Sequence, residues 1–332
     1  MNYNYPSYLR LYQTGELKKR VEYLEKILYS CHLCPRSCGI NRMKNEKGYC
    51  RSGYLPIVQS FTPHFGEEPV LVGKYGSGTI FFGNCNLKCV YCQNYYISQE
   101  LNSSQTQGIS IEELSEIMLK LQKMGCHNVN LVSPTHFVPQ IVKAIYFAIH
   151  DGFNLPIVYN TNSYESVETI KLLDEIIDIY LPDIKYSDYS MALKYSDVKN
   201  YVEHSQSVIL EMWRQVGKLT IDENGIAKRG VLIRHLILPK NIAGSYQSLK
   251  FISEKLSPEA TLSIMGQYCP THKAHLYPEI NRPINEDEYE GVMEIIESLN
   301  MEENVFIQKL ESHRYYQPNF SNKENPFTIN SL

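Results

Sequence analysis

Short apolar runs alternate along the chain with segments in which apolar residues recur at helical spacing. Six of these runs are only a few residues long and predict β-strands. They cover residues 79–82, 129–132, 156–159, 176–181, 231–238 and 261–265. Because strands alternate with helices, the pattern predicts an α/β fold with a parallel sheet and right-handed crossovers.

Two of the helical segments carry clear start signals. Ser110 is followed three residues later by Glu113, as in a capping box, and Gly125 is expected to end that helix. Asn285 and Glu288 form a similar pair at the start of a later helix. Six strand–helix units fit a partial (β/α)6 TIM-like barrel or an open doubly wound sheet. In both folds the functional residues gather at the C-terminal ends of the strands.

The N-terminal part of the chain has a different pattern. Residues 14–30 predict an amphipathic helix, whose apolar face is Leu17, Val21, Leu24 and Leu28. The stretch that follows, to about residue 76, is rich in Gly, Pro and Arg, which is typical of irregular backbone held by a metal. We therefore predict an N-terminal helix and small cysteine-rich metal-binding segment (1–76), a barrel domain (77–312) and a C-terminal tail (313–332).

Composition and charge exclude several classes of protein. The 332 residues include 32 Lys and Arg against 36 Asp and Glu, a net charge of −4, so no broad basic surface for nucleic acid is expected. No charge-free apolar run reaches the roughly 18 residues of a membrane helix, and the N-terminus lacks a signal-peptide pattern. We therefore expect a soluble, cytoplasmic protein without a membrane partner.

The nine cysteines fall into clusters, which favours metal sites over disulfides. One group contains four, the second contains three, and Cys126 and Cys269 stand alone. The second group, Cys85, Cys89 and Cys92, has the spacing C-x3-C-x2-C directly after the first predicted strand. Three soft thiolates can hold an iron–sulfur cluster with one iron left open, or zinc with a fourth ligand elsewhere.

The first group is a complete ligand set. Cys31, Cys34, Cys38 and Cys50 have the spacing C-x2-C-x3-C-x11-C within twenty residues. Four thiolates predict a closed site that holds zinc, a single iron or an auxiliary iron–sulfur cluster. Such a site serves structure or electron transfer, and the small segment around it would depend on the metal for its stability.

The three-cysteine motif, with Tyr91 just before its last cysteine, resembles that of the radical S-adenosylmethionine (SAM) superfamily. Together with CHLCPRSCGINR, EKGYC and GSGTIFFGNCNLKCVYCQN, it is similar to a subgroup named for likeness to pyruvate formate-lyase activating enzyme. The resemblance covers roughly residues 28–270. It implies a partial (β/α)6 barrel, a [4Fe-4S] cluster on Cys85, Cys89 and Cys92, and SAM bound at its open iron. Reductive cleavage of SAM would then yield a 5′-deoxyadenosyl radical that abstracts hydrogen from the substrate, with Tyr91 near the adenine.

Polar residues at the other strand ends are candidate cofactor contacts. Many members of the superfamily carry Gly-Gly-Glu after the second strand, whereas this chain has Ser133-Pro134-Thr135-His136. Ser133 and Thr135 would supply oxygens there, or they only end the strand and cap a helix. His136 is a candidate catalytic donor, or an ordinary hydrogen-bonded side chain.

Further candidates follow the next three strands. Asn160 and Asn162 resemble the position that contacts the ribose, although Asn is also a common turn residue. Asp183 and Lys185 resemble the Asp-x-Lys of glycyl-radical activating enzymes, and a charged pair ending an apolar strand favours a catalytic role. Arg234 would bind the cofactor carboxylate or close a structural ion pair. Gln267 and Tyr268 are weaker candidates, and His64, Glu67 and Glu68 reach the barrel mouth or form a charged turn.

The sequence thus predicts a radical SAM enzyme of the activating-enzyme-like kind, an oxidoreductase that takes hydrogen from a protein, a peptide or a small molecule. Its electron would come from a donor such as flavodoxin or ferredoxin. A second enzymatic interpretation is a peptide or cofactor maturase whose four-cysteine site holds an auxiliary cluster. A non-catalytic iron–sulfur or zinc protein, either an electron carrier or a binding module, is the alternative from another class.

Overall fold

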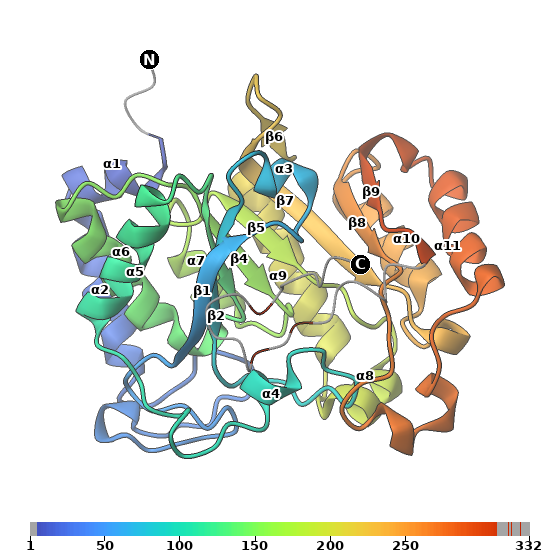
Figure 1. Cartoon of the computed structure of the whole chain (residues 1–332), viewed down its shortest axis with the longest axis horizontal. Coiled ribbons are helices and arrows are strands. Elements are labelled where there is room, and N and C mark those ends of the chain that lie inside the picture. The colour runs from blue at the N-terminus through green and yellow to red at the C-terminus, as the bar shows by residue number, and fades with distance from the viewer. Residues whose placement is uncertain (1–4, 311–317, 319, 321–325, 327–332) are drawn as a thin grey trace.

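A single sheet organises the molecule in the computed structural model, which describes residues 5–310, 318, 320 and 326 (Figure 1). The strands lie in the order β1-β2-β3-β4-β5-β7-β8-β9, and β6 pairs with β7 at one side. Neighbours from β2 to β9 along this order are parallel, whereas β1 and β6 pair antiparallel. The strands are β1 (Val58–His64), β2 (Ser77–Phe82), β3 (Val129–Val132), β4 (Ile157–Thr161), β5 (Ile179–Pro182), β6 (Thr220–Ile221), β7 (Ala227–Leu236), β8 (Thr261–Met265) and β9 (Val305–Ile307).

Helices cover the outer face of this curved sheet. Helices α2, α5 and α6 lie on the side of β1 to β4, and α10 and α11 lie beside β8 and β9 (Figure 1). The helices are α1 (Tyr8–Gln13), α2 (Glu16–Ile27), α3 (Pro69–Val72), α4 (Tyr95–Ser98), α5 (Ile111–Lys123), α6 (Val138–His150), α7 (Val167–Leu172), α8 (Tyr189–Ser196), α9 (Tyr201–Val216), α10 (Ser245–Lys255) and α11 (Glu286–Ser298). The predicted α/β class is confirmed, in the form of a partial TIM-like barrel.

All six predicted strands are present, with small differences in their ends. Strand β5 begins at Ile179, later than the predicted 176–181, because Ile176 and Ile177 still bond to the carbonyl of Leu173 in the turn after α7. The capping boxes of Ser110 with Glu113 and of Asn285 with Glu288 both form. Strands β1, β6 and β9 were not predicted from the apolar pattern.

The two faces of the sheet have different partners. Outward residues such as Leu131 and Ile233 belong to the large core beneath the helices. On the inner face, a smaller apolar cluster joins Val158, Ile179 and Leu232 to Leu71 of the short helix α3. Helix α3 lies at the end of the barrel where the parallel strands begin, so it closes that end from inside (Figure 1).

The N-terminal segment is tied into the same body. The predicted helix of residues 14–30 is α2, and Gly15, at φ 74°, separates it from α1, which was not predicted. Strand β1 belongs to the predicted segment 1–76 and pairs with β2, and the boundary at residue 76 stays a prediction. The predicted tail, 313–332, lies outside the described residues except for 318, 320 and 326. Phe320 packs edge-on against Phe81, with ring centroids 5.4 Å apart.

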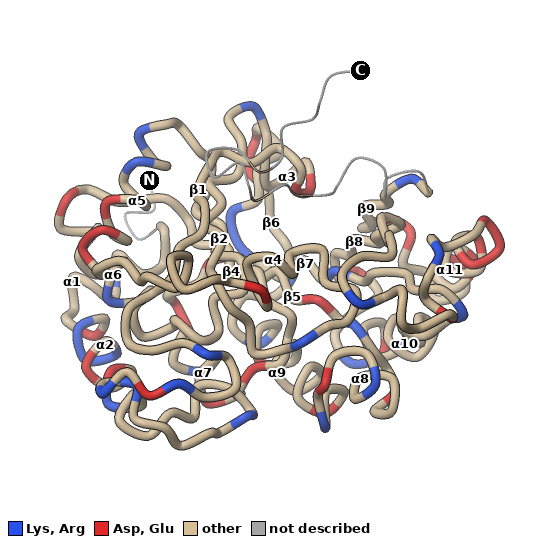
Figure 2. The backbone as a smooth tube through the Cα atoms, turned by 60° about the horizontal axis from the view of Figure 1, so that its bottom comes forward, with Lys and Arg blue, Asp and Glu red and all other residues tan. Residues whose placement is uncertain are grey.

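Charges of both signs are interspersed over the described backbone (Figure 2). This distribution agrees with the small net charge of −4. Within the part of the chain that the structure describes, every helix is too short or too polar to cross a membrane.

Candidate active site

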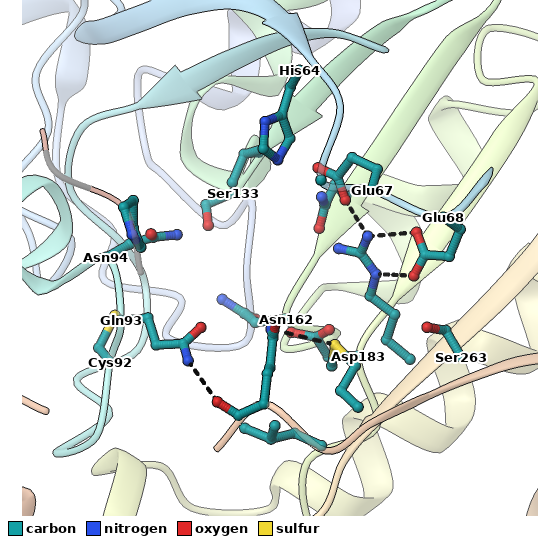
Figure 3. Close-up of a pocket in the computed structure, with 18 of the residues that line it drawn as sticks. His64, Glu67, Glu68, Cys92, Gln93, Asn94, Ser133, Asn162, Asp183 and Ser263 are labelled. Atoms are coloured by element: carbon teal, nitrogen blue, oxygen red, sulfur yellow. Dashed lines mark hydrogen bonds and ion pairs between the residues drawn. The ribbon is translucent and has the colours of Figure 1, made fainter. Parts of the chain in front are cut away.

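A cavity of about 1440 Å³ opens at the C-terminal ends of the parallel strands. The last residues of β3, β4, β5, β7, β8 and β9, or those just beyond them, line this cavity, as does the loop that follows β2. Figure 3 shows side chains from these segments pointing into one shared space. Side chains alternate between the two faces of each strand, so every second one points to the inner face. Helix α3 covers the inner-face residues where the strands begin, and those near the C-terminal ends are left to line the cavity.

The loop after β2 places Cys85, Cys89 and Cys92 in the wall of the cavity. Its backbone is held by the C-terminal end of α8, since the amides of Lys88 and Val90 donate to the carbonyls of Ser196 and Tyr195. Burial raises the pKa of the Cys85 thiol to about 12 and that of Cys89 to about 11. Burial also raises the pKa of Cys92. Without a positive partner these thiols would stay protonated, so thiolates here need a metal to stabilise them.

Each of the three sulfurs has a polar neighbour. The Ser196 hydroxyl donates to Cys89 Sγ at 3.0 Å, and Asn162 Nδ2 donates to Cys85 Sγ at 3.4 Å. The Ser98 Oγ lies 3.3 Å from Cys92 Sγ. Hydrogen bonds of this kind stabilise negative charge on sulfur.

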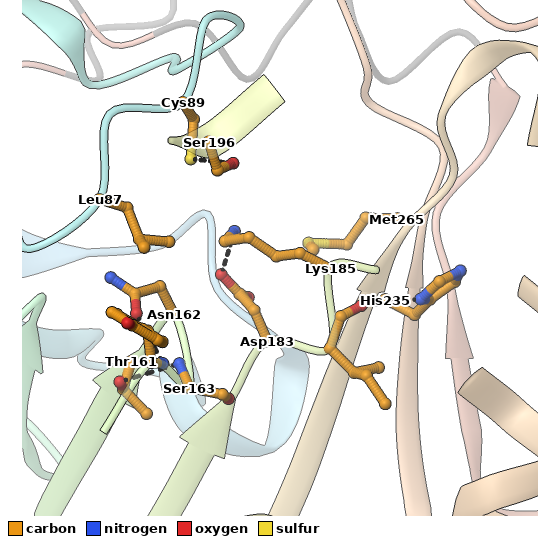
Figure 4. A network of polar contacts seen from close by, with 12 residues as sticks. Leu87, Cys89, Thr161, Asn162, Ser163, Asp183, Lys185, Ser196, His235 and Met265 are labelled. Carbon is orange, nitrogen blue, oxygen red and sulfur yellow. Dashed lines mark hydrogen bonds and ion pairs between the residues drawn. The ribbon is translucent and has the colours of Figure 1, made fainter. Parts of the chain in front are cut away.

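Asp183 and Lys185 form an ion pair just after the end of β5, with Lys185 Nζ 2.6 Å from Asp183 Oδ2 (Figure 4). Both side chains line the cavity, and both are largely buried. Burial disfavours the ammonium, but the Asp183 carboxylate outweighs it and raises the pKa of Lys185. The pair therefore presents a fixed positive and a fixed negative group beside the cysteine loop.

Arg234, within β7, also lines the cavity and pairs with Glu67 and Glu68, which Figure 3 labels. Its Nε and Nη2 donate to the two oxygens of Glu68 at 2.8 and 2.6 Å, a bidentate arrangement. Despite burial, Arg234 lowers the pKa of Glu68. The structure thus shows the ion pair that was one of the two predicted roles of Arg234. Glu67, Glu68 and Arg234 all line the cavity, and we call this charged group the floor of the cavity.

Several other predicted cofactor contacts also line the cavity. They are Tyr91, Ser133, Asn160 and Asn162. Ser133 has φ 56°, a left-handed conformation that turns the chain sharply after β3. Its amide donates to the carbonyl of Asn160 at 2.9 Å, so the ends of β3 and β4 are tied together.

Thr135 and His136 do not line the cavity. The Thr135 hydroxyl donates to Glu165 at 2.6 Å, and burial raises the pKa of Glu165 to about 7. The His136 Nε2 lies 2.8 Å from the Gly83 carbonyl, and burial lowers the pKa of His136 to about 3. Its ring packs against Phe137. The structure therefore places the predicted catalytic histidine and Thr135 in the core, away from the cavity they were expected to serve.

The four-cysteine segment packs beside the cysteine loop. Arg36 Nε donates to the Asn86 carbonyl at 3.2 Å, and the Tyr49 hydroxyl donates to Asp197 at 2.6 Å. Burial raises the pKa of Cys34 to about 12, and nearby Cys50 and Cys31 add to the increase. The other thiols of this group influence the pKa values of Cys31 and Cys34, so the four lie near one another. Among the described residues, those of the three-cysteine loop included, no three His, Cys, Asp or Glu side chains have the spacing of a single-ion site, so the second metal site stays a prediction.

The comparison with known families decides what kind of protein this is. A sequence model described as "Radical SAM superfamily" matches residues 79–241, from β2 to the end of β7. The chain belongs to the radical SAM superfamily. The match contains the three-cysteine loop and the ends of β3, β4, β5 and β7, which are the segments that build the cavity.

Two relatives come from the archaeon Methanocaldococcus jannaschii. The uncharacterized protein MJ0674 is 34% identical over 293 residues, which cover 86% of this chain and 80% of that protein. The uncharacterized protein MJ0808 is 25% identical over 266 residues, which cover 75% and 71%. Among solved structures, the FeFe-hydrogenase maturase HydG from Carboxydothermus hydrogenoformans has a TM-score of 0.46 and 13% identity. It covers 73% of this chain, which spans 55% of that maturase.

Radical SAM membership implies a [4Fe-4S] cluster and SAM as cofactors, and the residues present fit both. Three thiols line one cavity, that of Cys89 buried and the other two partly buried, and three is one fewer than a closed cluster site needs. The cavity volume of about 1440 Å³ exceeds the roughly 300–1,000 Å³ typical of small-ligand pockets, so SAM leaves room for a substrate. Fixed charges and amide groups line the same space, as a zwitterionic nucleoside cofactor requires.

Some residues of the site were not identified from the sequence. Gln93 and Asn94 point into the cavity beside Cys92 (Figure 3). Ser98 and Ser196 contact the cysteine sulfurs. The position of Gln93 and Asn94 directly after the cysteine motif was a usable signal. Ser196 is more than a hundred residues from Cys89, and nothing in its local sequence indicates that contact.

Proposed function

We propose that this chain is a radical SAM enzyme of the activating-enzyme-like kind. The observation that carries the proposal is the position of Cys85, Cys89 and Cys92 together in the wall of a cavity at the strand ends. These cysteines would hold a [4Fe-4S] cluster, which would supply the electron for reductive cleavage of SAM to a 5′-deoxyadenosyl radical, and that radical would abstract hydrogen from a substrate. The protein's own part is to bind, orient and shield the reacting groups.

The residues around the cavity divide this work. Lys185 and Asp183 offer one positive and one negative group beside the cysteine loop, which suits the carboxylate and ammonium of the methionine part. Asn160 and Asn162, at the end of β4, would contact the ribose. Tyr91 is buried in the wall and offers an aromatic surface for the adenine. Ser133 stands in the place of the usual Gly-Gly-Glu segment.

The substrate is proposed to be a protein or peptide carbon, or that of a small molecule, bound against the floor of the cavity. The floor carries Glu67, Glu68 and Arg234, whose formal charges sum to −1. The ion pair with the two glutamates occupies two nitrogens of Arg234, so we assign Arg234 to this floor in preference to the cofactor carboxylate. The reducing electron is proposed to come from a partner such as flavodoxin or ferredoxin.

Anaerobic reconstitution with iron and sulfide, followed by reduction with dithionite and assay for 5′-deoxyadenosine, tests the proposal. We expect SAM-dependent product from the native chain and none from Cys85→Ala, Cys89→Ala or Cys92→Ala. Cys126→Ala is the matched control, because Cys126 is buried but lies outside both cysteine groups. No product from a reduced and fully loaded native protein would refute the proposed function.

The four-cysteine segment is proposed to hold a second metal, which is zinc, iron or an iron–sulfur cluster. Iron, sulfide and zinc analysis of anaerobically purified protein distinguishes these three. Cys31→Ala should remove this metal and leave the iron of the three-cysteine site in place. Full metal content in Cys31→Ala, with the native ratio of iron to zinc, would show that this segment binds no metal.

A further inference from the structure

The sulfur of Cys89 accepts a hydrogen bond that reaches it from a distant part of the chain. Ser196, the last residue of α8, donates its hydroxyl to Cys89 Sγ at 3.0 Å (Figure 4). The contact is fixed, because the Ser196 carbonyl also accepts from the amide of Lys88 within the cysteine loop. Ser196 is fully buried, so no water competes for its hydroxyl.

The contact extends into a chain of buried hydroxyls. The Tyr186 Oη lies 2.8 Å from the Ser196 Oγ, and the Tyr91 Oη lies 2.6 Å from the Tyr186 Oη. Because Ser196 donates to sulfur, its oxygen is left to accept from Tyr186, which in turn accepts from Tyr91. A phenol keeps its proton at neutral pH, because its ordinary pKa is about 10, so both tyrosines can donate in this direction.

The other two sulfurs have donors at longer distances, and the amide of Leu87 is a second donor to Cys85 Sγ, at 3.4 Å. Asn162 Nδ2 lies 3.4 Å from Cys85 Sγ, and Ser98 Oγ lies 3.3 Å from Cys92 Sγ. A donor that itself accepts a hydrogen bond is polarised and donates more strongly. Among the described contacts to the three sulfurs, the one to Cys89 is therefore expected to be the strongest.

We propose that Ser196, Tyr186 and Tyr91 form a hydrogen-bond chain that raises the reduction potential of the cluster held by Cys85, Cys89 and Cys92. This inference rests on the proposed function, since it requires the cluster. Reduction adds negative charge to the cluster and its thiolates, and a donor at the sulfur stabilises that charge. Tyr91 lines the cavity, so the chain joins the cavity wall to the cluster sulfur. Ser196 and Tyr186 are thus positioning residues that act through Cys89.

An anaerobic redox titration followed by electron paramagnetic resonance, without SAM, measures the midpoint potential directly. Ser196→Ala should lower the reduced-to-oxidised ratio at a given potential about tenfold, equivalent to about 59 mV for a one-electron couple. Tyr186→Phe keeps the Ser196 donor but removes its polarisation, so it should lower the midpoint by a smaller amount.

Ser205→Ala and Tyr8→Phe are matched controls. The Ser205 hydroxyl is buried and donates to the Val202 carbonyl, and the buried Tyr8 hydroxyl donates to the Leu155 carbonyl. Both should keep the native midpoint. Equal midpoints in native protein, Ser196→Ala and Tyr186→Phe, at equal cluster content, would refute the chain and leave the proposed function intact.

Loss of the cluster in both Ser196→Ala and Tyr186→Phe, while the two controls keep theirs, would also refute the inference. The hydrogen-bond chain would then hold the cysteine loop together instead of setting the potential of the cluster. A native protein that binds no cluster at these cysteines would overturn the proposed function and this inference together.

Discussion

Asp178 is a buried carboxyl at the end of the barrel opposite the cavity. Its Oδ1 accepts from the amide and the hydroxyl of Ser7 at 3.1 and 2.9 Å, whereas its Oδ2 has no hydrogen-bond partner in the structure. Burial raises the pKa of Asp178 to about 6, and the Ser7 bonds and nearby Arg229 only partly oppose this. The folded protein therefore holds the proton of Asp178 at pH values where the unfolded chain has released it.

Stability should fall as pH rises through this range. Below about pH 3.9, the pKa of an unfolded-chain Asp, the Asp178 carboxyl is protonated in both the folded and the unfolded state, and the stability of the folded protein is not reduced. Between about pH 3.9 and 6 the free energy of unfolding falls, by roughly 3 kcal/mol in total, and above pH 6 this loss stays constant. Asp178→Asn keeps the Oδ1 acceptor and removes the ionisation.

Urea unfolding of the native chain and Asp178→Asn, at a series of pH values from 4 to 8, checks this prediction. The difference in unfolding free energy between the two proteins should grow in favour of Asn up to about pH 6. A difference that does not change with pH would contradict the assignment.

At the scale of residues, the sequence located the side chains whose position is set locally. Cys85, Cys89 and Asp183 lie at or just after the ends of apolar runs, so the strand prediction already placed them at the cavity. His136 lies three residues after Ser133, where the chain has already entered the core, so it does not reach the cavity. Contacts between distant segments, such as that of Ser196 with Cys89, depend on crossover geometry and left no local pattern.

Among the elements, the four-residue helix α3 contributes both to the core and to the cavity. Leu71 is fully buried against Val158, Ile179 and Leu232 on the inner face of the sheet. The residues just before it, Glu67 and Glu68, reach the cavity floor. The helix therefore both closes the barrel and positions the floor. The apolar pattern did not reveal it, because four residues are too few to show a period.

Leu71→Ala should lower the free energy of unfolding by about 2–5 kcal/mol, since it leaves a cavity inside the barrel that its neighbours cannot fill. Thermal and urea unfolding measure the loss. Leu210→Ala on α9 is the control, because Leu210 is 40% exposed and its truncation should cost much less. Equal losses in the two variants would show that α3 is not a structural plug.

The cysteine-rich segment acts as a support for the cysteine loop. Arg36, between Cys34 and Cys38, donates to the Asn86 carbonyl at 3.2 Å and to the Asp197 carbonyl at 2.6 Å. Its guanidinium also lies 3.6 Å from the centroid of the Tyr49 ring. Through these contacts the four-cysteine segment packs directly against the loop of the proposed cluster site.

Arg36→Ala should loosen the loop without unfolding the barrel. Hydrogen exchange should accelerate at the amides of Lys88 and Val90, because their bonds to α8 lose the support of Arg36. Arg20→Ala is the matched control, since Arg20 also donates to two carbonyls, at Leu172 and Asp174, far from the loop. Unchanged exchange at residues 85–92 in Arg36→Ala would contradict a supporting role.

Across the whole molecule, the order of strands and helices was predictable because each of the six predicted parallel strands contains a buried apolar run. The edges of the sheet were not. Strand β1 is antiparallel and lies in the irregular segment that is rich in Gly, Pro and Arg, and β9 is three residues long. Both edge strands line part of the cavity, through His64 at the end of β1 and Phe306 in β9, so the backbone of this part of the site was not predicted.

The distribution of charge over the whole molecule bears on the electron donor. The net charge is −4, yet three exposed lysines border the cysteine loop. Lys88 lies within it, the amide of Lys273 bonds to the Val90 carbonyl, and Lys199 follows the end of α8. In the described part of the chain, none of the three forms an ion pair. We expect this face to attract a donor with an acidic surface toward the three-cysteine loop.

Reduction of the reconstituted cluster by an acidic flavodoxin should therefore slow severalfold between low and physiological ionic strength. Lys88→Glu and Lys273→Glu should each slow it further at low salt, whereas Lys123→Glu on α5, an exposed lysine distant in the fold, should not. Stopped-flow absorbance measures the rate, and reduction by dithionite shows that the cluster itself is unchanged. Equal flavodoxin rates in all variants would mean that the donor approaches another face. The electron would then have to cross the barrel or the four-cysteine segment, and a conducting auxiliary cluster there would become the next hypothesis to test.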